Sequence, residues 1–160
     1  MTRYFLLLTG LLLHLISCTD EEVCLIPNTT QLKITTKVKQ ENLWKDSLLT
    51  NARLYFGNTP MYQYSIRNSQ YSSLLLNPQE DITRFYFQAD SSDFSPTGID
   101  TCTLQYTRQL KFISKACGYY TEFTIQNLSY TTHTIDSIWI TNPLVNQNIN
   151  TNHLQLALKQ

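Results

Sequence analysis

The stretch TCTLQYTRQLKFISKACGYYTEFTIQ, residues 101–126, contains three runs in which apolar side chains alternate with polar ones. The runs cover residues 101–108, 110–115 and 119–126, and Cys-Gly at 117–118 marks a turn before the third. Alternation with a period of two is typical of half-buried β-strands. We therefore predict three strands here, and we expect the third to be central in its sheet because strands precede and follow it.

The rest of the chain repeats this pattern, and no stretch has the 3.6-residue periodicity of a helix. Gly57-Asn58 predicts a hairpin turn, Asn77-Pro78 ends a strand, and residues 90–98, DSSDFSPTG, form a loop. Short strands at intervals of about 8 to 12 residues predict an all-β fold: a single antiparallel β-sandwich, Ig-like or related, of about nine strands. The further strands are expected at residues 31–39, 48–56, 61–66, 72–76, 82–89, 133–141 and 153–159.

The first 18 residues, MTRYFLLLTGLLLHLISC, have the pattern of a cleaved export signal. Arg3 supplies the positive start, residues 4–16 are apolar, and Ser17 is a small residue directly before Cys18. The segment resembles the lipobox of Gram-negative lipoproteins, which implies that Cys18 is lipidated and becomes the first residue of the mature chain. We therefore expect residues 1–17 to be a signal peptide and the anchor to be a lipid.

Two alternatives compete with this interpretation. A transmembrane helix needs about 20 apolar residues, whereas residues 4–16 supply 13, with His14 among them. A signal peptide cleaved without lipidation remains the stronger alternative, because a cysteine can follow a small residue by chance.

Downstream of the signal we expect two parts: a lipidated cysteine and tether at residues 18–30, and the β-sandwich at 31–160. The tether begins with Thr-Asp-Glu-Glu at 19–22. Acidic residues after the lipidated cysteine resemble the surface-export signal of Bacteroidetes lipoproteins, and a solvated linker is the alternative. The expected location is the outer membrane, facing either the periplasm or the cell surface.

The charge balance argues against a nucleic-acid partner. The whole chain has 12 Lys plus Arg and 12 Asp plus Glu, and loss of Arg3 leaves 11 against 12, a net charge of −1. No basic cluster is available to bind phosphates. Tyr, Thr, Ser, Asn and Gln instead dominate the polar composition, which favours strands.

A family resemblance lies in Leu-Gln-Tyr-Thr-Arg at 104–108, Phe-Ile-Ser-Lys-Ala-Cys-Gly-Tyr at 112–119 and Thr-Glu-Phe at 121–123. These segments resemble a family of small Bacteroidetes lipoproteins known only as a domain of unknown function. The resemblance extends over nearly the whole chain. It implies an envelope location, an all-β fold and cysteines at Cys24 and Cys117, but it supplies no catalytic residues.

Three cysteines remain once Cys18 is assigned to the lipid, and an oxidising envelope compartment favours disulfides. Cys24 lies in the tether and Cys117 in a turn, whereas Cys102 shares a face with apolar residues. We therefore predict a Cys24–Cys117 disulfide and a free Cys102 in the core. The other two pairings, or no bond, are the alternatives.

Candidates for catalysis or metal binding are few. After residue 17 the only glycines are Gly57, Gly98 and Gly118, so phosphate-binding glycine loops are absent, as are GxSxG and HExxH motifs. No cofactor is expected. His133 and His153 lie 20 residues apart, at the starts of predicted strands, where exposed or hydrogen-bonding roles are the default. Weak candidate ligands for a calcium ion, with a solvated turn as the alternative, are Asp90, Asp93 and Asp100.

Two further patterns concern the surface. Asp-Ser-Leu at 46–48 and Asp-Ser-Ile at 136–138 resemble the Bacteroidetes O-glycosylation acceptor, which makes Ser47 and Ser137 candidate sites. Trp44 and Trp139 could provide a sugar-stacking platform or an interface hot spot. The alternative is that most aromatic side chains belong to the core.

Two functions of different class follow. The first is a non-catalytic cell-envelope lipoprotein whose β-sandwich binds an envelope protein or a glycan, or has a structural role. The second is a small envelope hydrolase or metal-dependent enzyme, and it lacks a recognisable set of nucleophile, base and orienting residue.

Overall fold

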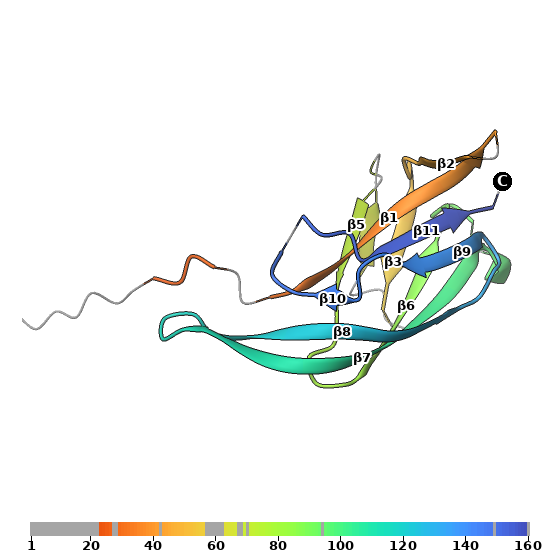
Figure 1. Cartoon of the computed structure of the whole chain (residues 1–160). Helices are drawn as coiled ribbons and strands as arrows, with labels where there is room; N and C mark the ends of the chain where they lie inside the picture. Colours follow the sequence, from red (N-terminus) through yellow and green to blue (C-terminus); the bar gives the residue numbers. More distant parts are fainter. Residues whose placement is uncertain are drawn as a thin grey trace, which may run out of the picture.

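The computed structural model describes residues 23–26, 29–41, 43–56, 63–66, 69, 71–93, 95–148 and 150–159. They form two packed β-sheets, which confirms the all-β sandwich (Figure 1). Outside the described residues lie the predicted signal peptide, the lipidation site Cys18, the Gly57-Asn58 turn and the start of the strand predicted at 61–66.

The first sheet has five strands and contains both the first and the last strand of the domain. β1 pairs with β11 on one side, and on the other side with β5 along its first half and β2 along its second half; β9 then pairs with β11. The β1–β11 pair is parallel, whereas the other described pairs of this sheet are antiparallel. A tight turn enforces antiparallel pairing only between neighbours in sequence, and these two strands are separated by the whole domain. The strands are β1 (Gln31–Gln40), β2 (Leu43–Asp46), β5 (Tyr71–Leu75), β9 (Ile135–Ile140) and β11 (Leu154–Leu158).

The second sheet has six strands in the order β10-β8-β7-β6-β3-β4, and all its pairs are antiparallel. A short 3₁₀ helix, η2 (Pro96–Gly98), connects β6 to β7. The strands are β3 (Ala52–Tyr55), β4 (Gln63–Ile66), β6 (Ile82–Gln88), β7 (Ile99–Ser114), β8 (Gly118–Tyr130) and β10 (Leu144–Val145).

Several strand predictions were wrong in detail. The two strands predicted at 101–108 and 110–115 are one strand, β7, because Arg108 and Gln109 stay paired with β8 through Phe123 and Glu122. β8 is next to the sheet edge rather than central, since only the two-residue β10 covers its far side. The strand predicted at 48–56 is confined to β3. The short strands β2 and β10 were not predicted.

The core lies between the sheets and follows the predicted alternation. Leu32 and Ile34 of β1 are buried, and so are Phe85 of β6 and Phe123 of β8. Burial of such a side chain contributes about 1.5 to 3 kcal/mol relative to exposure. Other fully or almost fully buried residues are Leu54, Leu74, Phe87, Cys102, Leu104, Ile135, Leu154 and Leu156.

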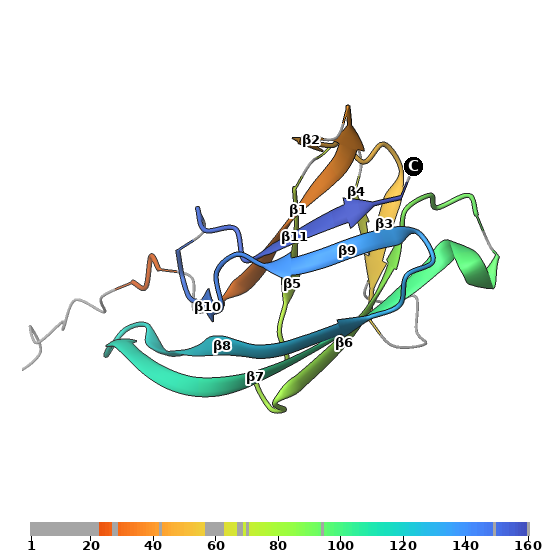
Figure 2. The ribbon, with the colours of Figure 1, turned by 45° about the vertical axis from the view of Figure 1, so that its right-hand side comes forward.

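The β7–β8 hairpin is longer than the rest of its sheet. β6 pairs with β7 only between Ile99 and Gln105, whereas β8 pairs with β7 as far as Ser114. The hairpin therefore projects beyond the other strands, and it projects toward the end of the molecule from which the N-terminal segment leaves (Figures 1 and 2).

Candidate functional site

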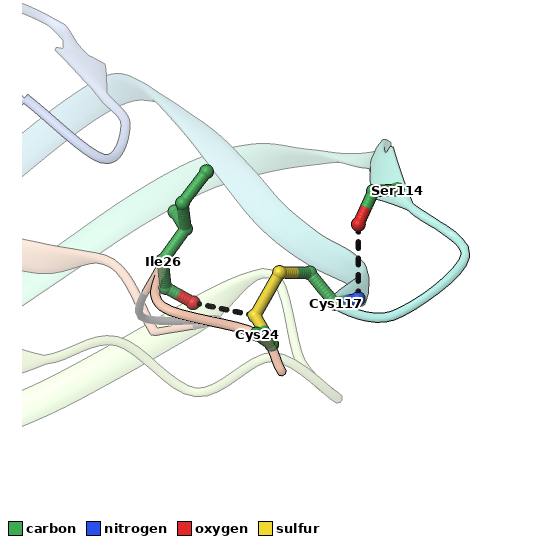
Figure 3. The surroundings of a disulfide bond; sticks show 4 residues. All are labelled: Cys24, Ile26, Ser114 and Cys117. Carbon is green, nitrogen blue, oxygen red and sulfur yellow. Dashed lines mark hydrogen bonds between the residues drawn. A yellow bond between two sulfur atoms is a disulfide. The ribbon is translucent and has the colours of Figure 1, made fainter. Parts of the chain in front are cut away.

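A disulfide joins the N-terminal segment to the end of the projecting hairpin. Cys24 is bonded to Cys117, with their Cα atoms 4.9 Å apart and a sequence separation of 93, which confirms the predicted pair (Figure 3). The sulfur of Cys24 also lies 3.1 Å from the carbonyl oxygen of Ile26. Because a disulfide sulfur carries no proton, this is a contact rather than a hydrogen bond.

The turn that carries Cys117 is fixed by its own residues. The backbone N–H of Cys117 donates to the hydroxyl of Ser114, and Gly118 has φ 70°, a conformation that glycine adopts without strain (Figure 3). A second connection lies nearer the sandwich, where the hydroxyl of Thr30 donates to the carbonyl of Thr121 at 2.8 Å. The N-terminal segment is thus tied to the hairpin at two points.

We call residues 110–121 the hairpin tip. Leu110, Phe112 and Tyr119 are exposed by 65%, 59% and 56%, and the rings of Phe112 and Tyr119 meet edge to face at 5.2 Å. The strand register places these side chains on the same face as Tyr106 and Phe123, which are buried in the core. The apolar face of the hairpin therefore continues past the end of the sandwich into solvent.

The two tryptophans singled out from the sequence meet on the outer face of the five-stranded sheet. Trp44 of β2 and Trp139 of β9 have ring centroids 6.0 Å apart, and Trp44 is 41% exposed. Both point away from the core, because Trp139 pairs with Gln155 and Trp44 with Lys39, whose neighbours in sequence face inward. Ala157 on the same outer face is fully buried, and we infer that the indole rings help to cover it. We call the outer surface that Trp44 and Trp139 form the tryptophan face.

The glycosylation candidates belong to the same sheet. Ser137 is half-buried, and its hydroxyl donates to the carboxylate of Asp136 at 3.0 Å. Ser47 is also half-buried; its N–H donates to the carbonyl of Thr36, and its carbonyl accepts from the Thr36 hydroxyl. Neither serine is fully exposed, so a glycan at either position would have to extend from the sheet surface.

Asp100 is the most extensively hydrogen-bonded side chain among those described. It is fully buried, and its two oxygens accept bonds from the loop that leads into β9. Burial alone would raise the pKa of Asp100, but the donors at His133, Thr134 and Ile135 together lower it below the usual value. The donors are the hydroxyls of Thr131 and Thr134 and the backbone N–H groups of His133, Thr134 and Ile135, at 2.6 to 2.9 Å.

The structure does not bring the three candidate calcium ligands together. Asp90 accepts bonds from the N–H and hydroxyl of Ser92, and Asp93 accepts a bond from the N–H of Ser95, so each stabilises its own turn. The carboxylate oxygens of Asp100 instead accept hydrogen bonds from residues 131–135, in the loop before β9 and at its first residue. Within the described part of the chain, no three His, Cys, Asp or Glu side chains form a group that could hold a metal ion.

The two histidines have different hydrogen-bond partners and do not form a shared site. The Nδ1 of His133 donates a bond to the carbonyl of Ile99 at 2.8 Å and lies 3.8 Å from the carboxylate of the buried Asp100. His153 is buried, and its Nδ1 accepts the N–H of Lys33 at 2.9 Å, which is one of the two roles, exposure or hydrogen bonding, expected from the sequence. Burial lowers the pKa of His153. These contacts connect strands and loops of the fold.

Cys102 is the free cysteine of the described chain and lies in the core, as predicted. Burial, with a smaller effect of the Asp100 charge, raises the pKa of its thiol to about 12. At neutral pH the group is therefore a protonated thiol and a poor nucleophile.

Two features were not found by sequence reasoning: the Asp100 network and the exposed hairpin tip. Alternation alone assigns Leu110 and Phe112 to a buried face, and it cannot show where a sheet ends. The sequence did contain one indication that residues 110–121 are not fully buried. Two lysines lie among the apolar residues of this segment, and the segment has no acidic residue.

These observations define a small β-sandwich domain in which a disulfide cross-links the N-terminal segment to a projecting hairpin. The chain belongs to the Family of unknown function (DUF6452), whose model matches residues 31–158, from the first residue of β1 to the last of β11. The chain has no significant match among curated proteins or among solved structures. The described residues contain no helix of the length and apolarity required to span a membrane.

Proposed function

We propose that this protein is a non-catalytic lipoprotein of a Bacteroidetes outer membrane, anchored by lipid on Cys18, whose β-sandwich binds an envelope protein or a glycan. The observation that carries the proposal is the Cys24–Cys117 disulfide. Structural disulfides persist in oxidising compartments such as the cell envelope. The LISC sequence at 15–18 and the acidic residues at 20–22 add the export and lipidation pattern.

The disulfide also gives the proposed anchor a geometry. Cys18 precedes Cys24 by six positions, and an extended chain spans at most about 3.5 Å per residue. The lipidated residue would then lie within about 20 Å of the hairpin tip. Without the disulfide, the described contact that still ties the N-terminal segment to the hairpin is the hydrogen bond of Thr30, which lies further from Cys18 in sequence.

The tryptophan face is the surface that we propose for the partner. Large aromatic side chains supply much of the binding energy at protein interfaces and stack on sugar rings. Trp44 is exposed there, and Lys37 and Asp46 form an ion pair on the same face. The candidate glycosylation sites Ser47 and Ser137 belong to this sheet, so a glycan at either one would lie near the proposed interface.

Replacement of Cys18 by alanine tests the anchor. We expect the Cys18→Ala protein to leave the membrane fraction or to accumulate as an uncleaved precursor, because the residue that carries the lipid is absent. Fractionation of cells followed by immunoblotting measures the distribution, and Cys102→Ala is the matched control because it changes a buried cysteine. A Cys18→Ala protein that is processed and membrane-bound like the wild type would contradict the proposal.

Site-specific cross-linking tests the binding surface. A photoreactive residue at Lys39, which is exposed and pairs with Trp44 on the same face, should capture a partner in native membranes, and Trp44→Ala should abolish the product. The control carries the same photoreactive residue in place of the exposed Thr97, which lies in η2 between β6 and β7 of the other sheet. Equal products at both positions, or a product that Trp44→Ala leaves unchanged, would show that this face is not the interface.

A further inference from the structure

We propose that the hairpin tip, residues 110–121, docks into the interfacial region of the membrane that holds the lipid anchor, so that the sandwich has a fixed orientation on the bilayer. This inference rests on the proposed lipidation of Cys18. It adds a second membrane contact, made by the protein itself, at a place where the fold provides no cover for apolar side chains.

The first argument is the continuity between the tip and the anchor. Cys117, in the turn of the hairpin, is covalently bonded to Cys24, and six positions separate Cys24 from Cys18. The residues beside Cys24 are themselves apolar and exposed: Val23 by 79% and Leu25 by 89%. The segment between the proposed lipid and the sandwich is therefore attached to the tip through Cys24, and exposed apolar side chains flank that attachment point.

The second argument is the chemistry of the tip. Leu110 and Phe112 are exposed apolar side chains, and tyrosines at 119 and 120 combine an apolar ring with a polar hydroxyl. Tyrosine is enriched at membrane interfaces, where one end of the side chain is apolar and the other is hydrated. Lys115 in the turn is exposed, and a lysine can bury its aliphatic part while its ammonium group stays at the headgroups. No acidic side chain lies between residues 110 and 121.

The third argument is the contrast between the two ends of the hairpin. β7 has 16 residues and is therefore roughly 50 Å long. The loop before its first residue carries the exposed carboxylates Asp90 and Asp93, and it lies at the opposite end of the molecule from the tip (Figures 1 and 2). Of the two ends of the hairpin, the apolar one is therefore the end that is joined to the proposed anchor.

The backbone geometry also suits an interfacial position. β7 and β8 remain paired with each other through Phe112 and Tyr119 up to the turn, whereas β6 pairs with β7 only as far as Gln105, so the outer edges of the ribbon keep backbone groups that hydrated headgroups can satisfy. The exposed side chains extend from a two-stranded ribbon that is held at its end by the disulfide. Docking therefore requires no rearrangement of the sandwich.

Fluorescence quenching by brominated lipids tests the proposal. The lipidated protein is purified from membranes and placed in phosphatidylcholine vesicles with bromine on the acyl chains, which quenches only indoles that reach the chains. Phe112→Trp introduces a probe at the tip, and Thr97→Trp introduces a matched probe at the other end of the hairpin. We expect the added emission of Phe112→Trp to be lost in brominated vesicles and to shift to shorter wavelength in plain ones, while that of Thr97→Trp is retained.

Leu110→Trp provides a second tip position if Phe112→Trp perturbs the hairpin, since Leu110 is equally exposed. Protein that sediments with the vesicles while both tip probes remain unquenched would overturn the docking and leave the lipid anchor intact. Cross-linking of the unquenched tip to an envelope protein would assign the surface to that protein instead. A mature N-terminus without acyl chains, by mass spectrometry, would overturn both the docking and the proposed function.

Discussion

The double variant Cys24→Ser/Cys117→Ser is expected to lose about 4 to 5 kcal/mol of unfolding free energy, less any compensation by strain relief. The bond closes a loop with a sequence separation of 93, which includes β1 to β7 and leaves β8 to β11 outside it. In the chain-entropy model a loop of this length restricts the unfolded chain strongly. The loss is a large part of the 5 to 15 kcal/mol typical of a domain.

Urea denaturation of the oxidised wild type and the variant measures the difference. Cys102→Ala is the control, because it removes only one small buried side chain and should cost about 1 to 2 kcal/mol. Reduction of the wild type with a thiol should reproduce the loss seen in the double variant. A double variant as stable as the wild type would mean that the disulfide orders the N-terminal segment without stabilising the sandwich.

Asp100→Ala is expected to cost about 3 to 5 kcal/mol, because it leaves a set of buried donors without an acceptor. The two oxygens of Asp100 accept five hydrogen bonds from residues 131–135, and the side chain is completely buried. Asp100→Asn should cost less than Asp100→Ala, because the amide keeps one acceptor oxygen. It should still destabilise the fold, because its N–H₂ group faces other donors. Asp90→Asn, at an exposed turn, should have a much smaller effect than either.

The same carboxylate predicts a pH dependence. Hydrogen bonds, outweighing the effect of burial, hold the pKa of Asp100 in the folded protein below its ordinary value of 3.8. As the pH falls below 3.8, the unfolded chain therefore binds the proton first, and the unfolding free energy decreases until the lower, folded pKa is reached. Asp100→Asn should have a shallower acid slope than the wild type in thermal melts between pH 5 and about 2. Equal slopes would contradict the stabilising role of the charged form.

Sequence alone predicted the class of the fold because alternation is a local property. Leu32 and Ile34 point inward and Lys33 and Lys37 outward, as their spacing indicates. The parallel pairing of β1 with β11 could not be predicted in this way, since it depends on which strands meet after the whole domain has folded. The length of β7 was missed for a related reason, because the polar Arg108-Gln109 pair looks like a turn unless the partner strand is known.

The site was predicted in part. The disulfide followed from the positions of Cys24 and Cys117, and the tryptophans were recognised by type but not as neighbours, since 95 positions separate them in sequence. Asp100 was assigned to a loop with Asp90 and Asp93, whereas its actual partners follow β8 and lie more than 30 positions further along the chain. Contacts between distant segments therefore decided what these residues do.

The most direct test of the account is the mass of one disulfide-linked peptide pair from protein purified out of the membrane. Cleavage after Lys and Arg without reduction produces residues 18–33, which contain both Cys18 and Cys24, whereas Cys117 lies in 116–159 and Cys102 in 85–108. We predict that peptide 18–33 carries acyl chains at Cys18 and is linked to peptide 116–159. A mature N-terminus without lipid or downstream of Cys18, or a bridge to peptide 85–108, would contradict the account.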